Sequence, residues 1–156
     1  MSFVYKPPTE WIAPDVFPTE LLCQAKEIAI DLETRDPNLK ELGPGYIRGD
    51  GEAVGISFAI DGYENYFPFA HESGFNFSKK KVLEFTKKIC ATDSDKIFHN
   101  STYDVGWLTH HGIPVNGRII DTMIVAPLID ENQFWFSLNA LGREYINEGK
   151  SEGELS

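Results

Sequence analysis

Alternating apolar and polar positions predict three β-strands in the first half of the chain. The run Glu27–Glu33 alternates and carries β-branched residues, which is typical of a central strand. A second apolar run covers Val54–Ile60, and the turn Asp61-Gly62 leads from it to a third run, Asn65–Phe69. The last two runs predict a hairpin. Because proline cannot donate a ladder hydrogen bond, Pro68 predicts that the third strand lies at an edge of the sheet.

Apolar positions spaced three and four residues apart predict helices in the second half. Lys79–Ala91 places its apolar residues on one face, and Ser78 is a suitable N-cap. Strand and helix then alternate: we predict a strand over 96–99, a helix over 103–111, a strand over 118–120, and helices over 121–129 and 138–146. This order predicts an α/β fold in which helices pack on the faces of a mixed sheet.

Segments rich in proline and glycine divide the chain. Four prolines in residues 1–26 predict an extended lead-in with one short helical turn near 21–25. Residues 35–51 hold two prolines and four glycines, which predicts a long loop, and such loops are often functional. We expect one domain over 27–147 and a flexible tail over 148–156, where no apolar stripe is present.

Length and composition fit one soluble domain. The 156 residues are 42% hydrophobic, which is enough to bury a core. No run of about 18 apolar residues occurs, and the N-terminus lacks the features of a signal peptide. We therefore expect a cytoplasmic protein without a membrane partner. Cys23 and Cys90 lie outside any metal-binding spacing and are interpreted as buried small hydrophobes.

The net charge of −10 narrows the expected partners. A protein that holds DNA by charge alone is usually basic. Carboxylates can still meet phosphates when divalent cations lie between them, and a basic neighbouring domain can deliver the substrate. The charge argues against a free-standing DNA-coating protein and leaves metal-dependent chemistry on nucleic acid open.

Asp31 and Glu33 form the first candidate site. Residues two apart on a strand point to the same face, so both carboxylates leave the first strand on one side. Two like charges placed this way repel each other unless a cation lies between them. The alternative is that one of them only caps the following loop.

Asp104 follows the predicted strand that ends at His99 and lies in the first turn of the next helix. This position can direct its carboxylate back across the edge of the sheet, with Asn100 holding the turn and Tyr103 beside it. The alternative is a structural acid that stabilises the N-terminus of the helix.

Together, Asp31-x-Glu33 and Asn100-x-x-x-Asp104 resemble the first two exonuclease motifs of the DnaQ-like (DEDD) superfamily. Two further runs, Asp121–Leu128 and Ser137–Leu141, look like the matching stretch of the proofreading domains of family A DNA polymerases. The sequence of residues 31–51 is especially similar to that of bacteriophage polymerases of that family. The resemblance covers roughly residues 27–146 and implies an RNase H-like fold with a five-stranded mixed sheet.

The resemblance also implies a 3′-5′ exonuclease that uses two Mg²⁺ or Mn²⁺ ions on the terminal phosphodiester of DNA. Asp31 would bridge both ions and Glu33 would bind the ion on the nucleophile side. Asp104 would hold the second ion, directly or through water. The implied partners are a single-stranded 3′ end of DNA and the polymerase domain of a parent protein, in a bacterial or phage-infected cell.

The same resemblance implies a set of substrate-binding residues. Thr34 would contact the 3′-terminal nucleotide, and Asn100 and Tyr103 would support the site beside it. Leu39 would supply an apolar wedge against the terminal base.

The chain departs from the family at the third motif. A Tyr-x-x-x-Asp or His-x-x-x-x-Asp is expected on a final helix, yet Tyr145 is followed four residues later by Gly149, and no Asp occurs after residue 146. The missing acid would weaken a metal site, so we expect a fragment that lacks its C-terminal part and has little or no activity.

Two rival functions remain open: a non-catalytic RNase H-like module for nucleic-acid docking or assembly, and a ribonuclease of the same superfamily. The remaining polar candidates are interpreted as structural. His110 and His111 are expected at a helix end, Asp121 as a helix cap, and Lys79–Lys81 on a solvated helix face. His99 is expected to pack near the site without a catalytic role.

Overall fold

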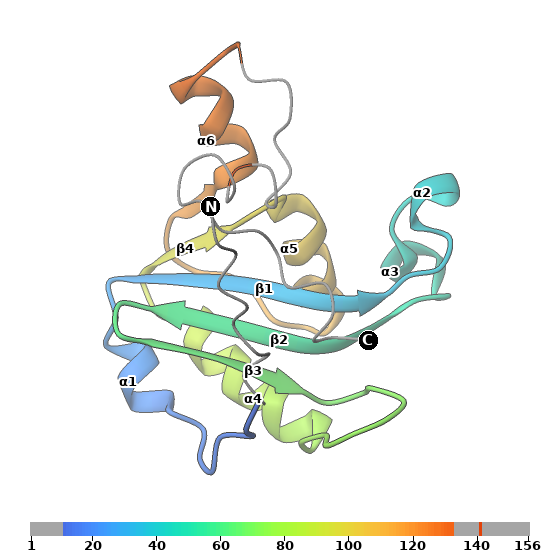
Figure 1. The fold of residues 1–156 in the computed structure, drawn as a ribbon, viewed down its shortest axis with the longest axis vertical. Coiled ribbons are helices and arrows are strands. Elements are labelled where there is room, and N and C mark those ends of the chain that lie inside the picture. Colours follow the sequence, from blue (N-terminus) through green and yellow to red (C-terminus); the bar gives the residue numbers. More distant parts are fainter. Residues whose placement is uncertain (1–10, 133–140, 142–156) are drawn as a thin grey trace, which may run out of the picture.

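The computed structural model of the chain describes residues 11–132 and residue 141. In this part of the chain one five-stranded sheet runs in the order β3-β2-β1-β4-β5 (Figure 1). Its strands are β1 (Glu27–Arg35), β2 (Glu52–Ile60), β3 (Tyr63–Pro68), β4 (Asp95–Phe98) and β5 (Ile119–Asp121). β1 pairs antiparallel with β2 and parallel with β4, β2 pairs antiparallel with β3, and β4 pairs parallel with β5. The mixed sheet with β1 at its centre confirms the predicted fold class, and β3 lies at the edge as Pro68 predicts.

The described residues also form six helices. They are α1 (Thr19–Cys23), α2 (Leu39–Leu42), α3 (Gly45–Arg48), α4 (Lys79–Cys90), α5 (Ser101–His110) and α6 (Thr122–Ile129). Alternation along β1 buries Ile28, Ile30 and Leu32, which join one core with Phe85 of α4 and Trp107 of α5. Figure 1 shows α4 and α5 behind the sheet, and the opposite face of β1 is left for polar side chains.

The helix predicted over 79–91 is confirmed as α4. The side chain of Ser78 accepts the N–H of Lys81 at 3.5 Å and caps the helix. The helix predicted over 103–111 forms as α5 and begins two residues earlier, at Ser101. The helix predicted over 138–146 lies outside the described residues, apart from the buried, helical Leu141.

One prediction about an irregular segment was wrong, and one predicted helical turn is shifted by two residues. Residues 35–51 are not one long loop, because β1 continues to Arg35 and the segment then forms α2 and α3. The lead-in contains α1, which begins at Thr19 rather than near residue 21. Phe17 draws the lead-in onto the core by stacking on Phe67, with ring centroids 5.7 Å apart. The predicted domain limits at 26, 147 and 156 remain predictions.

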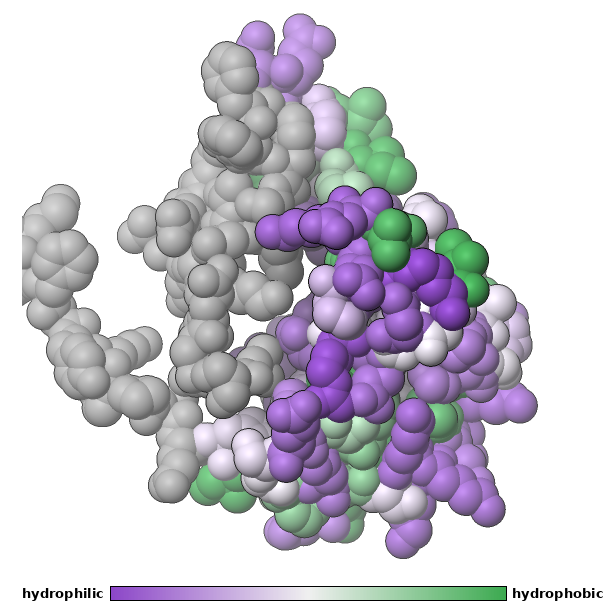
Figure 2. Space-filling view, turned by 90° about the vertical axis from the view of Figure 1, so that its right-hand side faces the viewer, coloured by the Kyte–Doolittle hydropathy of each residue, from purple (hydrophilic) through white to green (hydrophobic). Residues whose placement is uncertain are grey.

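α6 differs from the other helices in its exposed apolar surface. Ile124, Leu128 and Ile129 are all exposed, and Figure 2 shows hydrophobic side chains at the upper end of the molecule, where α6 lies. Most of the visible face below them is hydrophilic. Among the described residues, no helix is long and apolar enough to cross a membrane.

Candidate active site

Asp31 and Glu33 lie on the face of β1 opposite its buried leucine and isoleucines. Both acids are half-buried, while Leu32 between them is buried. The register with β2 shifts directly after Glu33, which pairs with Gly55, whereas Thr34 pairs with Ala53. A bulge of this kind bends the strand and changes the direction of the next side chains. The prediction that both carboxylates share one face is confirmed, because Asp31 and Glu33 alternate with the buried Ile30 and Leu32. Thr34 faces α5, where its hydroxyl meets that of Tyr103.

Asp104 brings a third carboxylate to the same place from α5. Its side chain is only 3% exposed, and its Oδ2 atom has no hydrogen-bond partner among the described residues. Burial, followed by the negative charges of Asp31, Glu33 and Asp121, raises the pKa of Asp104 to about 8, although a backbone hydrogen bond from Leu32 opposes the shift. The acids of β1 and α5 are thus close enough to disfavour one another's ionisation.

This arrangement fits a divalent cation in its donor chemistry. A buried carboxylate oxygen without a partner is costly, and a cation would stabilise the ionised form that the neighbouring acids now oppose. Within the described residues, however, no group of three or more His, Cys, Asp or Glu side chains is arranged to hold an ion by itself.

Asp121 holds the turn that precedes α5. Its carboxylate accepts the backbone N–H groups of Asn100 at 3.0 Å and Ser101 at 2.7 Å, and also that of Met123 at 2.9 Å. Burial would raise the pKa of Asp121, yet these hydrogen bonds lower it. Asp121 caps α6 as predicted, and it also holds Asn100 in a left-handed conformation (φ 67°) at the start of α5.

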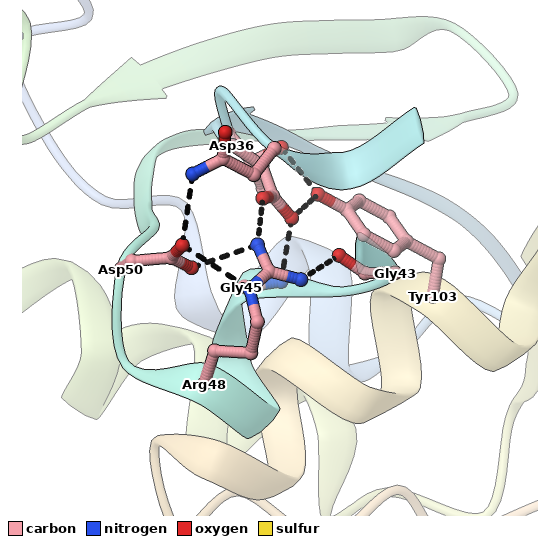
Figure 3. A network of polar contacts seen from close by, with 8 residues as sticks. Asp36, Gly43, Gly45, Arg48, Asp50 and Tyr103 are labelled. Atoms are coloured by element: carbon pink, nitrogen blue, oxygen red, sulfur yellow. Dashed lines mark hydrogen bonds and ion pairs between the residues drawn. The ribbon is translucent and has the colours of Figure 1, made fainter. Parts of the chain in front are cut away.

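Thr34 and Tyr103 meet at the other side of the acids. The hydroxyl groups of Thr34 and Tyr103 are hydrogen-bonded at 2.8 Å, and Tyr103 also donates to Asp36 at 3.0 Å (Figure 3). Two of the predicted substrate-binding residues are therefore joined directly. Leu39, a third one, is the first residue of α2 and is 37% exposed.

Asp36 anchors the segment that carries α2 and α3. Its side chain is 2% exposed and accepts the Gly45 N–H at 2.7 Å, while Arg48 approaches it at 3.3 Å and pairs with Asp50 at 2.8 Å (Figure 3). A Cβ atom at residue 45 would lie 2.8 Å from the Asp36 carboxylate, so only glycine allows this contact. Arg48 also donates to the carbonyl of Gly43.

His99 precedes α5, and His110 and His111 lie at its end as predicted. The Nδ1 atom of His99 lies 2.9 Å from the hydroxyl of Thr122. His110 ends α5 and His111 caps it, and both rings pack on Trp107. Burial lowers the pKa of His111.

Two polar residues near the acids have no motif in the sequence. One is Asp36, whose partners are distant in the chain. The other is Tyr66, which lines an open groove of about 560 Å³ together with Asp31. The only local signal for Tyr66 is the glycine at residue 55, inside the neighbouring strand, since such a glycine often marks a close approach.

A mixed five-stranded sheet in this order, with helices packed against it, is the α/β architecture of RNase H-like proteins. The chain belongs to the 3′-5′ exonuclease family of family A DNA polymerases, whose family model matches residues 18–155. It is 36% identical over 152 residues to a DNA-directed DNA polymerase of Pseudomonas phage M6, covering 94% of this chain and 23% of that protein.

Solved structures share the fold at low sequence identity. Brucella melitensis NrnC with bound Mg²⁺ matches with a TM-score of 0.60 and 20% identity, over 86% of this chain and 60% of that one. Escherichia coli RNase D, an exoribonuclease, matches with a TM-score of 0.62 and 15% identity, over 86% of this chain and 32% of that one. These likenesses confirm the RNase H-like fold.

Proposed function

We propose that this chain hydrolyses the terminal phosphodiester at a 3′ end of DNA, with Asp31, Glu33 and Asp104 holding two Mg²⁺ or Mn²⁺ ions. The observation that carries this proposal is Asp104, a buried acid whose Oδ2 atom is unpartnered and whose pKa is raised by Asp31 and Glu33. A structural acid at a helix N-terminus would be expected to gain hydrogen bonds there. Asp104 instead faces like charges, which a divalent ion would neutralise.

Each acid has a separate task. Asp31, central on the polar face of β1, would bridge the two ions, and Glu33 would hold the one on the side of the attacking water. Asp104, fixed by α5 and by the backbone of Leu32, would hold the second. Bound ions supply a water of lowered pKa and neutralise the charge that develops on the leaving oxygen.

Substrate binding is assigned to the residues around these acids. Thr34 and Tyr103, joined at 2.8 Å, form a polar edge that would contact the terminal nucleotide. Asn100, held by Asp121, would face the same nucleotide from the start of α5. Leu39 is one of three exposed apolar side chains on the segment beyond β1, with Leu42 and Ile47, and it would pack against the terminal base.

The proposed partners are a single-stranded 3′ DNA end and a polymerase domain. They are supported by the phage relative, which is a DNA polymerase, and by a Brucella melitensis NrnC structure bound to pGG. With a net charge of −10, the chain would rely on the ions and on the polymerase to receive DNA. A phage relative also supports the cytoplasm of a bacterial or phage-infected cell as its location.

The test is removal of the terminal nucleotide from a 5′-labelled single-stranded oligonucleotide in Mn²⁺. We expect slow degradation from the 3′ end, because no Tyr-x-x-x-Asp motif is present, and loss of that degradation in Asp104→Asn. Asp15→Asn, an exposed acid in the lead-in, is the matched control and should retain it. Degradation by Asp104→Asn at the wild-type rate would overturn the assignment of Asp104, and no degradation by either protein would favour a non-catalytic module.

A further inference from the structure

Tyr66 lies on the same face of the sheet as the proposed metal ligands. Asp31 pairs with Ser57 across β1 and β2, and Ser57 pairs with Tyr66 across β2 and β3. Directly opposed residues of adjacent strands point to the same side, so these three form one row. Asp31, Ser57 and Tyr66 also line the same open groove.

The phenol of Tyr66 lies across β2 toward Glu33. Gly55 is the residue of β2 that pairs with Glu33, and a Cβ atom placed on it would lie 1.9 Å from the hydroxyl oxygen of Tyr66. The hydroxyl therefore occupies the space that any other side chain at residue 55 would fill. The hydroxyl of Tyr66 thus lies over β2, the strand next to its own, beside the residue that pairs with Glu33.

His71 fixes the hydroxyl in this position. The Nε2 atom of His71 lies 2.5 Å from the hydroxyl oxygen of Tyr66. The backbone of His71 is held in turn by Asn76, which accepts its N–H at 2.9 Å and donates to its carbonyl at 3.0 Å. When Nε2 carries the ring proton, it donates to Tyr66, and the phenolic proton is free to point into the groove.

The electrostatic surroundings agree with this geometry. Burial, and after it the charges of Glu33 and Asp31, raise the pKa of Tyr66, so the phenol stays protonated at neutral pH. A neutral donor that faces acids needs no counter-charge of its own and can serve a phosphate group brought there by cations.

We propose that Tyr66 donates a hydrogen bond to a phosphate oxygen of the 3′-terminal nucleotide, and that His71 is the residue that positions it. This inference rests on the proposed function, because bound ions are needed to bring a phosphate next to Asp31 and Glu33. By this inference the substrate contacts the sheet edge formed by β3, on the side of the acids opposite Thr34 and Tyr103.

Binding of thymidine 5′-monophosphate in the presence of Mn²⁺, followed by calorimetry on the full chain, tests the inference. We expect Tyr66→Phe to weaken nucleotide binding about five- to tenfold, which is typical for one lost hydrogen bond. His71→Gln should weaken it less, since the phenol remains. Tyr63→Phe is the matched control: Tyr63 lies on the same strand, packs against the core, and should bind like the wild type.

Mn²⁺ affinity, measured beside nucleotide affinity, separates the possible outcomes. Unchanged nucleotide binding in Tyr66→Phe would overturn the inference and leave the proposed function standing. Weaker Mn²⁺ binding in Tyr66→Phe, by the same factor as the nucleotide, would also overturn it, because Tyr66 would then act on the carboxylates alone. Absence of Mn²⁺ binding by the wild type would overturn the proposed function and the inference with it.

Discussion

The hydroxyl of Tyr103 donates a hydrogen bond to the carboxylate of Asp36 at 3.0 Å, across 67 residues of sequence. Asp36 follows the end of β1, and Tyr103 precedes Asp104 in α5. This contact therefore fixes the distance between the strand that carries two acids and the helix that carries the third. It also ties the segment with α2 and α3 to the proposed site.

Asp36→Ala should destabilise the chain by about 2–4 kcal/mol, because Gly45, Arg48 and Tyr103 would lose a buried acceptor. Urea unfolding would measure the change. The control is Asp61→Ala, which removes an exposed acid in a turn and should cost less than about 0.5 kcal/mol. A loss as small as that of the control would show that the Asp36 network does not hold the segment.

Asp121→Ala should lower stability by about 1–3 kcal/mol, since Asp121 caps α6 and also binds the first N–H groups of α5. Asp121→Asn keeps an acceptor and should recover part of the loss. The measurement is the midpoint of thermal unfolding in EDTA. Equal midpoints for the wild type and Asp121→Ala would mean that the turn at Asn100 is held by other contacts.

Without metal, stability should fall as pH rises toward 8. The pKa of Asp104 is raised from 3.8 to about 8, so the folded chain binds a proton that the unfolded chain releases. The stabilisation is complete below pH 3.8 and is lost as pH rises through about 8, with a slope of up to about 1.4 kcal/mol per pH unit from this group. Urea unfolding in EDTA at pH 5 and pH 8 would measure it.

Asp104→Asn is the control for this slope, because the amide does not titrate. A similar dependence on pH in the wild type and Asp104→Asn would contradict the assignment of the shift to Asp104. Mn²⁺ should reverse the dependence in the wild type by favouring the ionised acid.

Gly55→Ala should displace the ring of Tyr66 and weaken nucleotide binding in Mn²⁺, since its Cβ would meet the phenolic oxygen at 1.9 Å. The clash disappears when the ring is removed, so Gly55→Ala should have little effect on stability in a Tyr66→Ala background. A double-mutant cycle by urea unfolding would measure the coupling. Additive effects would show that Tyr66 does not lie over Gly55.

The polar face of β1 could be predicted from the sequence because strand alternation is a local property. Two-residue periodicity alone places Asp31 and Glu33 together, opposite the buried Leu32. The position of Asp104 could also be predicted from local sequence, because a predicted strand, a turn and the start of a helix precede it directly. The burial of Asp104 could not be predicted from these local patterns, because it depends on packing between α5 and the sheet.

Residues 35–51 show where sequence composition misleads. Their glycines and prolines argue against helix, yet α2 and α3 form there because Asp36 binds the Gly45 N–H and Arg48 bridges Asp36 and Asp50. Tertiary contacts of this kind override local propensity. Tyr66 could not be assigned for a similar reason, since its role depends on the space above Gly55 in another strand.

Calorimetric titration of the full chain with Mn²⁺, repeated on Asp31→Ala and on Glu27→Ala, tests whether Asp31, Glu33 and Asp104 form a metal site. Glu27 is the exposed acid at the start of the same strand and serves as the matched control. We expect the wild type and Glu27→Ala to bind Mn²⁺ alike and Asp31→Ala to lose most of this binding. Equal binding by all three proteins would contradict the assignment of a metal site to Asp31, Glu33 and Asp104.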